Sequence, residues 1–154
     1  MINKVVFKKI KFNNIDPNKF KKYITKNGLF VFPAGPALAN IEKSSNYYKS
    51  IKEANFVFFD SGLFVILLKM FKNINVHKFS GFKFLGLFFE YLKKNKKNKI
   101  LCIDPNKKFS KSNKKYIKRL GLKKIYNYVA PNYYPNNLSD KNLLKIIKKF
   151  KPNY

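Results

Sequence analysis

The stretch NFVFFDSG, residues 55–62, passes from a strongly apolar run to an acidic residue and then to two small residues. Four consecutive apolar residues bounded by turn formers predict a buried strand over residues 55–59. Ser61 and Gly62 favour the start of a helix, which the following apolar residues extend over 61–71. A buried strand that leads directly into a helix is typical of parallel α/β sheets.

The same alternation continues along the chain in both directions. Strands are predicted over residues 5–12, 29–32, 55–59, 75–79, 99–103 and 123–128. Helices are predicted over residues 36–52, 61–71, 82–94, 110–120 and 139–150. The pattern predicts an α/β fold with a Rossmann-like, mostly parallel sheet and helices on both faces. Because no internal repeat or long linker interrupts it, residues 1–154 are expected to form a single domain.

Local chemistry predicts several helix ends. Ser139 and Asp140 are expected to cap the last helix, and Pro152 to stop it. Gly121 is expected to end the helix predicted over residues 110–120. The last helix is followed by Lys-Pro-Asn-Tyr, which is typical of the approach to another strand. We therefore expect the sheet to lack its last strand or strands, as in a chain truncated at the C-terminus.

The composition is extreme in charge. The 154 residues include 34 lysines and arginines against seven carboxylates, a net charge of +27, and Arg119 is the only arginine. A hydrophobic share of 45% excludes an intrinsically disordered chain. A lysine excess favours general attraction to anions over the bidentate recognition that arginine provides. Two interpretations stay open: a compositional bias carried on solvated faces, or a surface for an anionic partner such as a nucleotide-sugar, an acidic lipid headgroup or a nucleic acid.

Single residues narrow the chemistry. One cysteine, Cys102, excludes an internal disulfide, and one histidine, His77, excludes the usual His/Cys metal cluster. We expect Cys102 to be a small buried residue and His77 a surface or packing residue. The first twelve residues lack the apolar core of a secretory signal, and the longest apolar stretch, 62–68, is too short to span a bilayer. A cytoplasmic protein follows, with membrane-surface contact left open.

Three loops after predicted strands are the places where a ligand would bind, because ligands of open parallel sheets lie beyond the carboxyl ends of the strands. They are residues 30–36, 58–62 and 78–83. Asp60 stands out, since an acidic residue closes an apolar strand in a chain with few carboxylates. It could act as a general base toward a sugar hydroxyl, or it could cap the next helix. The tripeptide Asp-Ser-Gly alone does not decide between these roles.

In order and spacing, FPA at 32–34, DSG at 60–62 and GFK at 81–83 resemble the bacterial teichoic-acid and capsule glycosyltransferase family, which includes the N-acetylmannosaminuronic acid transferase of enterobacterial common antigen. That family has a Thr-Pro-Asn-like turn, an Asp-Gly motif and a Gly-x-Asp motif at these places. Residues 100–105 and 130–134 correspond to its glycine-bearing turn and its His-Gly-Tyr-like motif. The likeness covers roughly residues 28–154. This sequence departs from the family pattern at Phe32, Ala34 and Lys83.

The resemblance implies transfer of a sugar, an N-acetylhexosamine or its uronic acid, from a UDP-linked donor to a lipid-diphosphate-linked acceptor in cell-surface polysaccharide synthesis. Asp60 would be the catalytic base, lysines would offset the diphosphate charge, and no metal or cofactor is required. The substrate would be bound by Pro33, Gly35, Ser61, Gly62, Ser80, Gly81, Lys83, Asn132 and Tyr133. Family members continue into a further strand, a Gln-Glu loop and a basic tail. In the family that tail helps to engage the membrane, so the resemblance leaves open a peripheral position at the inner face of the cell membrane, and self-association stays open too.

Alternatives remain beside this interpretation. A basic nucleic-acid-binding domain is disfavoured because the phenylalanines fall in predicted core positions, including a stripe on the helix over 82–94. The chain could also be an inactive fragment of the glycosyltransferase family that docks with a separate chain. Asp104 could face the same cleft as Asp60 or simply form an Asp-Pro turn, and both stay open. Tyr133 could stack on a ring of the substrate or pack within its loop.

Overall fold

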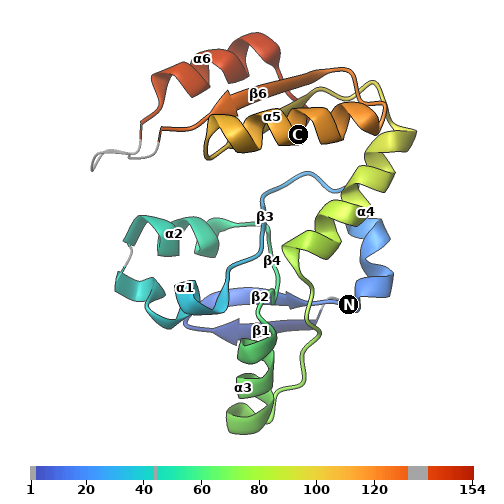
Figure 1. Ribbon diagram of the computed structural model, residues 1–154. Coiled ribbons are helices and arrows are strands. Elements are labelled where there is room, and N and C mark those ends of the chain that lie inside the picture. The colour runs from blue at the N-terminus through green and yellow to red at the C-terminus, as the bar shows by residue number, and fades with distance from the viewer. Residues whose placement is uncertain (1–2, 44, 132–138) are drawn as a thin grey trace. The chain divides into compact units, whose positions relative to one another are not determined.

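The computed structural model describes residues 3–43, 45–131 and 139–154. The chain divides into two compact units, Met1–Phe88 and Phe89–Tyr154, and each holds its own sheet with parallel strands (Figure 1). The predicted α/β class is confirmed: the chain combines helices with parallel-rich sheets and is compatible with a Rossmann-like fold. The expectation that residues 1–154 form a single domain stays a prediction.

Unit 1 builds a four-stranded sheet. Its elements are β1 (Asn3–Phe7), β2 (Ile10–Asn14), the 3-10 helix η1 (Pro17–Tyr23), β3 (Phe30–Val31), α1 (Gly35–Ala39), the 3-10 helix η2 (Ile41–Lys43), α2 (Ser45–Glu53), β4 (Phe56–Val57), α3 (Gly62–Lys72) and the start of α4 (Gly81–Lys94). The strand order is β1-β2-β4-β3. Only β1 and β2 pair antiparallel, whereas β4 pairs parallel with both β2 and β3.

Alternation along β4 and the residues after it explains why helices cover both faces of this sheet. Val57 and Phe59 join a buried cluster with residues of β2, α1, α2 and α3. Phe58 faces the other way, where its ring contacts Phe20 of η1 and Phe79. All five of these side chains are fully or almost fully buried. Each buried phenylalanine contributes roughly 2–3 kcal/mol, so the NFVFF run holds both layers to the sheet.

The strand predicted over residues 5–12 is wrong, because the chain turns back within it. Lys8 and Lys9 adopt positive φ angles of 46° and 58° and form a two-residue turn between β1 and β2. Such turns match the twist of a hairpin, and they are usually marked by Asn-Gly or Asp-Gly. The two lysines at this turn give no such signal. The sequence pattern therefore predicted one continuous strand where the structure has a hairpin.

The strand predicted over residues 75–79 is also absent. Asn14, at the end of β2, accepts a hydrogen bond from the His77 N–H (2.8 Å) and donates one to the Asn75 carbonyl oxygen (3.1 Å). One side chain thus replaces the ladder of a neighbouring strand. The segment rejoins the sheet edge only at Phe79, whose N–H donates to the Phe59 carbonyl oxygen at 2.8 Å.

Two helix predictions need correction as well. The helix expected over residues 36–52 is divided into α1, η2 and α2, with Asn40 ending α1. The phenylalanine stripe expected to be core on the helix over 82–94 is only partly so. Phe84 packs against Phe20 and Phe32, but Phe82 is 89% exposed and Leu85 is exposed too. The stripe winds around α4, so its members cannot all face one core.

Unit 2 contains β5 (Ile100–Asp104), α5 (Lys107–Arg119), β6 (Ile125–Val129) and α6 (Lys141–Phe150). The two strands pair parallel, from Ile100 opposite Ile125 to Asp104 opposite Val129. Figure 1 shows α5 and α6 on opposite sides of β6. Gly121, with φ of 78°, follows α5 as predicted. Asp140 caps α6 by accepting from the Leu143 N–H at 2.9 Å, so the cap is Asp140 and not Ser139.

The last residues lie against the outer edge of β5. The Leu101 N–H donates to the Tyr154 carbonyl oxygen (2.8 Å), and the Tyr154 N–H donates to the Lys99 carbonyl oxygen (3.2 Å). This exchange is the pattern of a parallel ladder. Tyr154 therefore runs in the same direction as β5 from the point where the two meet.

Candidate active site

Three segments meet at the carboxyl edge of the unit 1 sheet. Phe30 pairs with Phe56 and Val31 with Val57, so the loops after β3 and β4 leave the sheet side by side. The Phe79 N–H bonds to the Phe59 carbonyl oxygen and brings the third segment to the same edge. The predicted convergence of the three loops is thus present within one unit.

Asp60 reaches from the end of β4 to the start of α4. Its Oδ1 accepts a hydrogen bond from the Gly81 N–H at 3.1 Å, and the side chain is half-buried. In the described part of the chain, no hydrogen bond or ion pair engages its Oδ2. The carboxylate is therefore oriented through one oxygen, beside the positive end of a helix, while the other oxygen is available.

Ser61, and not Asp60, caps α3. The Ser61 Oγ accepts the Phe64 N–H at 3.3 Å. This removes the simplest structural explanation for Asp60, which was that it caps the helix that follows it. Ser80 has the same role for α4, where its Oγ accepts the Lys83 N–H at 3.2 Å.

Gly35 lies where the first and second loops approach most closely. A Cβ atom added at Gly35 would stand 2.6 Å from the Ser61 Oγ and 3.1 Å from the Ser61 Cβ. No side chain fits there unless Ser61 moves. At Gly81 a Cβ would meet only ordinary contacts with the Phe32 side chain, at 3.5 Å, so of the glycines at this edge it is Gly35 that leaves no room for a side chain. Pro33, in the same loop, is buried.

Two lysines supply positive charge to this edge. The Lys78 Nζ stands 3.5 Å from the position that a Cβ on Gly62 would take, next to the first residue of α3. Lys83 lies in the first turn of α4 with an exposed side chain. Because lysine is a flexible point charge, both side chains are candidates to contact an anion at this edge.

The structure therefore brings together most of the residues predicted for the site. They are Pro33, Gly35, Asp60, Ser61, Gly62, Ser80, Gly81 and Lys83. Asn132 and Tyr133 lie outside the described residues. Sequence reasoning placed Lys78 at the start of the third loop without selecting it as a site residue, and it missed Asn14. Asn14 positions the backbone at residues 75 and 77 that leads into Ser80, and its only signal is its place at the end of a strand.

A second carboxylate, Asp104, closes β5 in unit 2 but is only 2% exposed. Its Oδ1 accepts the Asn113 side-chain amide at 2.7 Å, and its Oδ2 accepts the Asn127 amide at 2.8 Å. Both oxygens are thus occupied. The interpretation that Asp104 faces a cleft is wrong, because the neighbouring asparagines draw it into the interior.

Cys102 lies on the same strand and is half-buried. Burial, with a smaller contribution from the Asp104 charge, raises the pKa of the Cys102 thiol to about 11. A cavity of about 280 Å³ in unit 2 is lined by Tyr126, Ile146, Lys149 and Phe150 and contains no carboxylate. Across the described ranges, no three His, Cys, Asp or Glu side chains gather as metal ligands would.

Comparisons with protein-family models and with curated proteins found no relative of this chain. No protein-family model matches the chain, and no curated protein matches it at a significant level. Within residues 3–43, 45–131 and 139–154, no helix has both the length and the apolar character needed to cross a membrane. The likeness to glycosyltransferases stays a prediction.

Proposed function

We propose that this chain is a glycosyltransferase in which Asp60 is the general base. The substrates are a nucleotide-sugar donor and a lipid-linked acceptor hydroxyl. The observation that carries the proposal is the state of Asp60: one oxygen is held by the Gly81 amide, and the other is available at the edge where three loops meet. A base must be oriented and still free to accept a proton, and this arrangement satisfies both needs.

In the proposed reaction, the Asp60 Oδ2 accepts the proton of the acceptor hydroxyl as its oxygen attacks the anomeric carbon. The bond from that carbon to the donor phosphate oxygen breaks, and the nucleoside diphosphate leaves with the electron pair. Lys78 and Lys83 offset the negative charge on the leaving group. The Gly81 amide keeps the carboxylate from rotating, so that Oδ2 stays directed at the acceptor.

A structural role for Asp60 is the competing explanation. A carboxylate near a helix N-terminus stabilises the helix by about 0.3–1 kcal/mol, and Asp60 has that relation to α4. The two roles make different demands on the side chain. A structural role needs an acceptor at Oδ1, whereas a catalytic role needs a basic oxygen at Oδ2.

The Asp60→Asn variant separates these roles, because asparagine keeps an Oδ1 acceptor for the Gly81 amide but cannot take a proton. We expect turnover to fall by about 100-fold or more, while the thermal unfolding midpoint changes little. Turnover is measured as UDP release from UDP-N-acetylhexosamines and their uronic acids in the presence of a lipid-diphosphate-linked acceptor.

The matched control is Asp16→Asn, which makes the same chemical change at the cap of η1. Asp16 accepts the Asn18 N–H at 2.9 Å, and asparagine caps equally well, so turnover should be unchanged. Full activity of Asp60→Asn would exclude the base role. A wild-type chain that releases no UDP with any of these donors would overturn the proposed activity of the chain itself.

A further inference from the structure

The outer face of α3 is apolar and is left exposed by the described residues of its unit. Residues at spacings of three, four, seven and eight point the same way on a helix. On α3 five large apolar side chains form such a set and all are exposed: Leu63 (67%), Ile66 (55%), Leu67 (39%), Met70 (70%) and Phe71 (75%). Phe64 and Leu68 point the opposite way, toward the buried cluster. The helix is thus apolar on the side that faces the core and on the side that does not.

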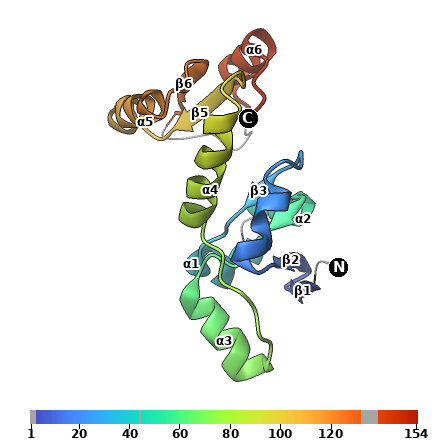
Figure 2. The ribbon, with the colours of Figure 1, turned by 90° about the vertical axis from the view of Figure 1, so that its right-hand side faces the viewer.

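This exposed face is continuous. Figures 1 and 2 show α3 projecting beyond the rest of unit 1 in both views. Single exposed apolar residues are ordinary, but five large ones on a single short helix are typical of a surface that binds something. We call these five residues the α3 outer face.

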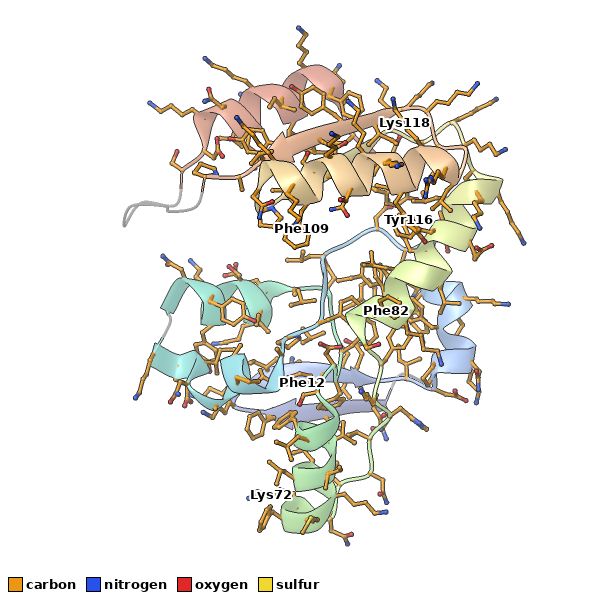
Figure 3. All side chains as sticks on the ribbon, viewed as in Figure 1. Phe12, Lys72, Phe82, Phe109, Tyr116 and Lys118 are labelled. Atoms are coloured by element: carbon orange, nitrogen blue, oxygen red, sulfur yellow. The ribbon has the colours of Figure 1, made fainter. Side chains whose placement is uncertain are left out.

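Lysines dominate the charges around the α3 outer face, and the carboxylate that precedes the helix, Asp60, is half-buried. From Gly62 to Lys83 there are four lysines and no carboxylate. Lys69 and Lys72 lie in the last turns of α3, where Figure 3 shows Lys72, and Lys78 lies beside its first residue. By the same spacing Lys72 leaves the helix on the side of Leu68, so it flanks the apolar face and does not lie on it. Lysines that flank an apolar face fit an anionic lipid surface, since their long side chains can reach headgroup phosphates while the face enters the acyl boundary.

The residue types also favour lipid over a protein partner. Protein interfaces concentrate their binding energy in tryptophan, tyrosine and arginine. The α3 outer face has none of these and consists of leucine, isoleucine, methionine and phenylalanine. With eleven residues, α3 is too short to cross a bilayer, so it would lie in the interface.

We propose that the α3 outer face docks this protein on membranes that contain anionic phospholipids. α3 begins directly after Asp60 and Ser61, so docking would place the lipid surface beside the candidate base. There a lipid-linked acceptor would present its sugar. The link to the acceptor rests on the proposed function, but the docking itself rests only on the surface of α3, so the two can fail separately.

Vesicle sedimentation tests the docking. The Ile66→Glu/Met70→Glu variant is compared with Phe109→Glu/Leu144→Glu, which replaces exposed apolar residues of α5 and α6 and changes the net charge equally. On vesicles of phosphatidylcholine with phosphatidylglycerol, we expect the α3 variant to bind about tenfold more weakly or worse, and the control to bind as wild type. Equal loss in both variants would mean that only the overall positive charge adsorbs, and would overturn the proposal.

A fluorescence measurement tests insertion, because the chain contains no tryptophan. Tryptophan placed as Phe71→Trp should shift its emission to the blue with phosphatidylglycerol vesicles and not with phosphatidylcholine alone. Tryptophan placed as Phe109→Trp should not shift. No shift for Phe71→Trp would overturn the proposal. A blue-shifted emission before vesicles are added would do so too, since another part of the chain or a second copy would then already cover the face. Circular dichroism confirms that each variant is folded.

Discussion

Asp60 and Asp104 look alike in the sequence and differ in the folded chain. Each closes an apolar run that forms a parallel strand, and each precedes a helix. Asp104 is buried with both oxygens bound by asparagine amides, whereas Asp60 is half-buried with one oxygen bound by a backbone N–H. The difference comes from polar partners supplied by other elements. A carboxylate can be buried when other residues donate hydrogen bonds to both of its oxygens. It remains available for chemistry when only one oxygen is bound and the other is open.

The largest expected effect on stability follows from removing the saturated carboxylate. Asp104→Ala leaves the amides of Asn113 and Asn127 without their acceptor in the interior and should lower the stability of unit 2 by about 3 kcal/mol. Asp60→Ala loses one partly exposed hydrogen bond and should cost about 1 kcal/mol in unit 1. Hydrogen exchange measured separately for the two units gives both values. Equal costs would remove the distinction between the two carboxylates.

A second effect follows from the surroundings of Asp104. Because the pKa of the Cys102 thiol is raised from 9.0 to about 11, its thiolate fraction at pH 8 should be about 100-fold below that of an ordinary cysteine. We expect slow alkylation by iodoacetamide in the native protein, with a rate that rises as pH approaches 11. Alkylation in guanidinium chloride provides the reference for the unfolded chain. Native and unfolded rates that agree at pH 8 would contradict the buried, negatively charged setting of β5.

The smallest expected effect on stability concerns the contact between Gly35 and Ser61 beside Asp60. Gly35→Ala would force the Ser61 Oγ away from its position as the α3 cap, at a cost of about 1 kcal/mol. The measurement is a double-mutant cycle with Ser61→Ala by urea unfolding. If the cap is what alanine disturbs, its cost should shrink once Ser61 is absent. A cost that is unchanged in that background would show that the α1 backbone, and not the serine hydroxyl, requires glycine at residue 35.

Much of the fold could be predicted from local patterns. The helix expected over residues 61–71 is found at Gly62–Lys72, and the strand expected over 99–103 at Ile100–Asp104. Both have strong apolar patterns and recognisable ends, so a single sequence suffices to place them. The edge where Asp60 lies could also be predicted, because the ends of parallel strands meet there.

What could not be predicted depends on contacts between distant residues. Asn14 replaces a strand partner for residues 75–77, more than sixty positions along the chain, and no local pattern indicates it. The two amides that bind Asp104 come from α5 and β6. The exposure of the α3 outer face could not be predicted for a different reason. A helix that is apolar on all sides has no sequence pattern that distinguishes its buried side from its exposed side.

The hydrogen bonds of Tyr154 have a practical consequence for anyone who fuses another sequence to this protein. The backbone at Tyr154 already runs in register with β5, and the Ile103 N–H faces the same edge two residues further on. A tag joined at the carboxyl end would therefore be guided along the sheet and would not hang free in solvent. An amino-terminal tag avoids this templating, and a carboxyl-terminal one should begin with proline, which has no N–H to donate to the ladder, and glycine, which weakens a strand.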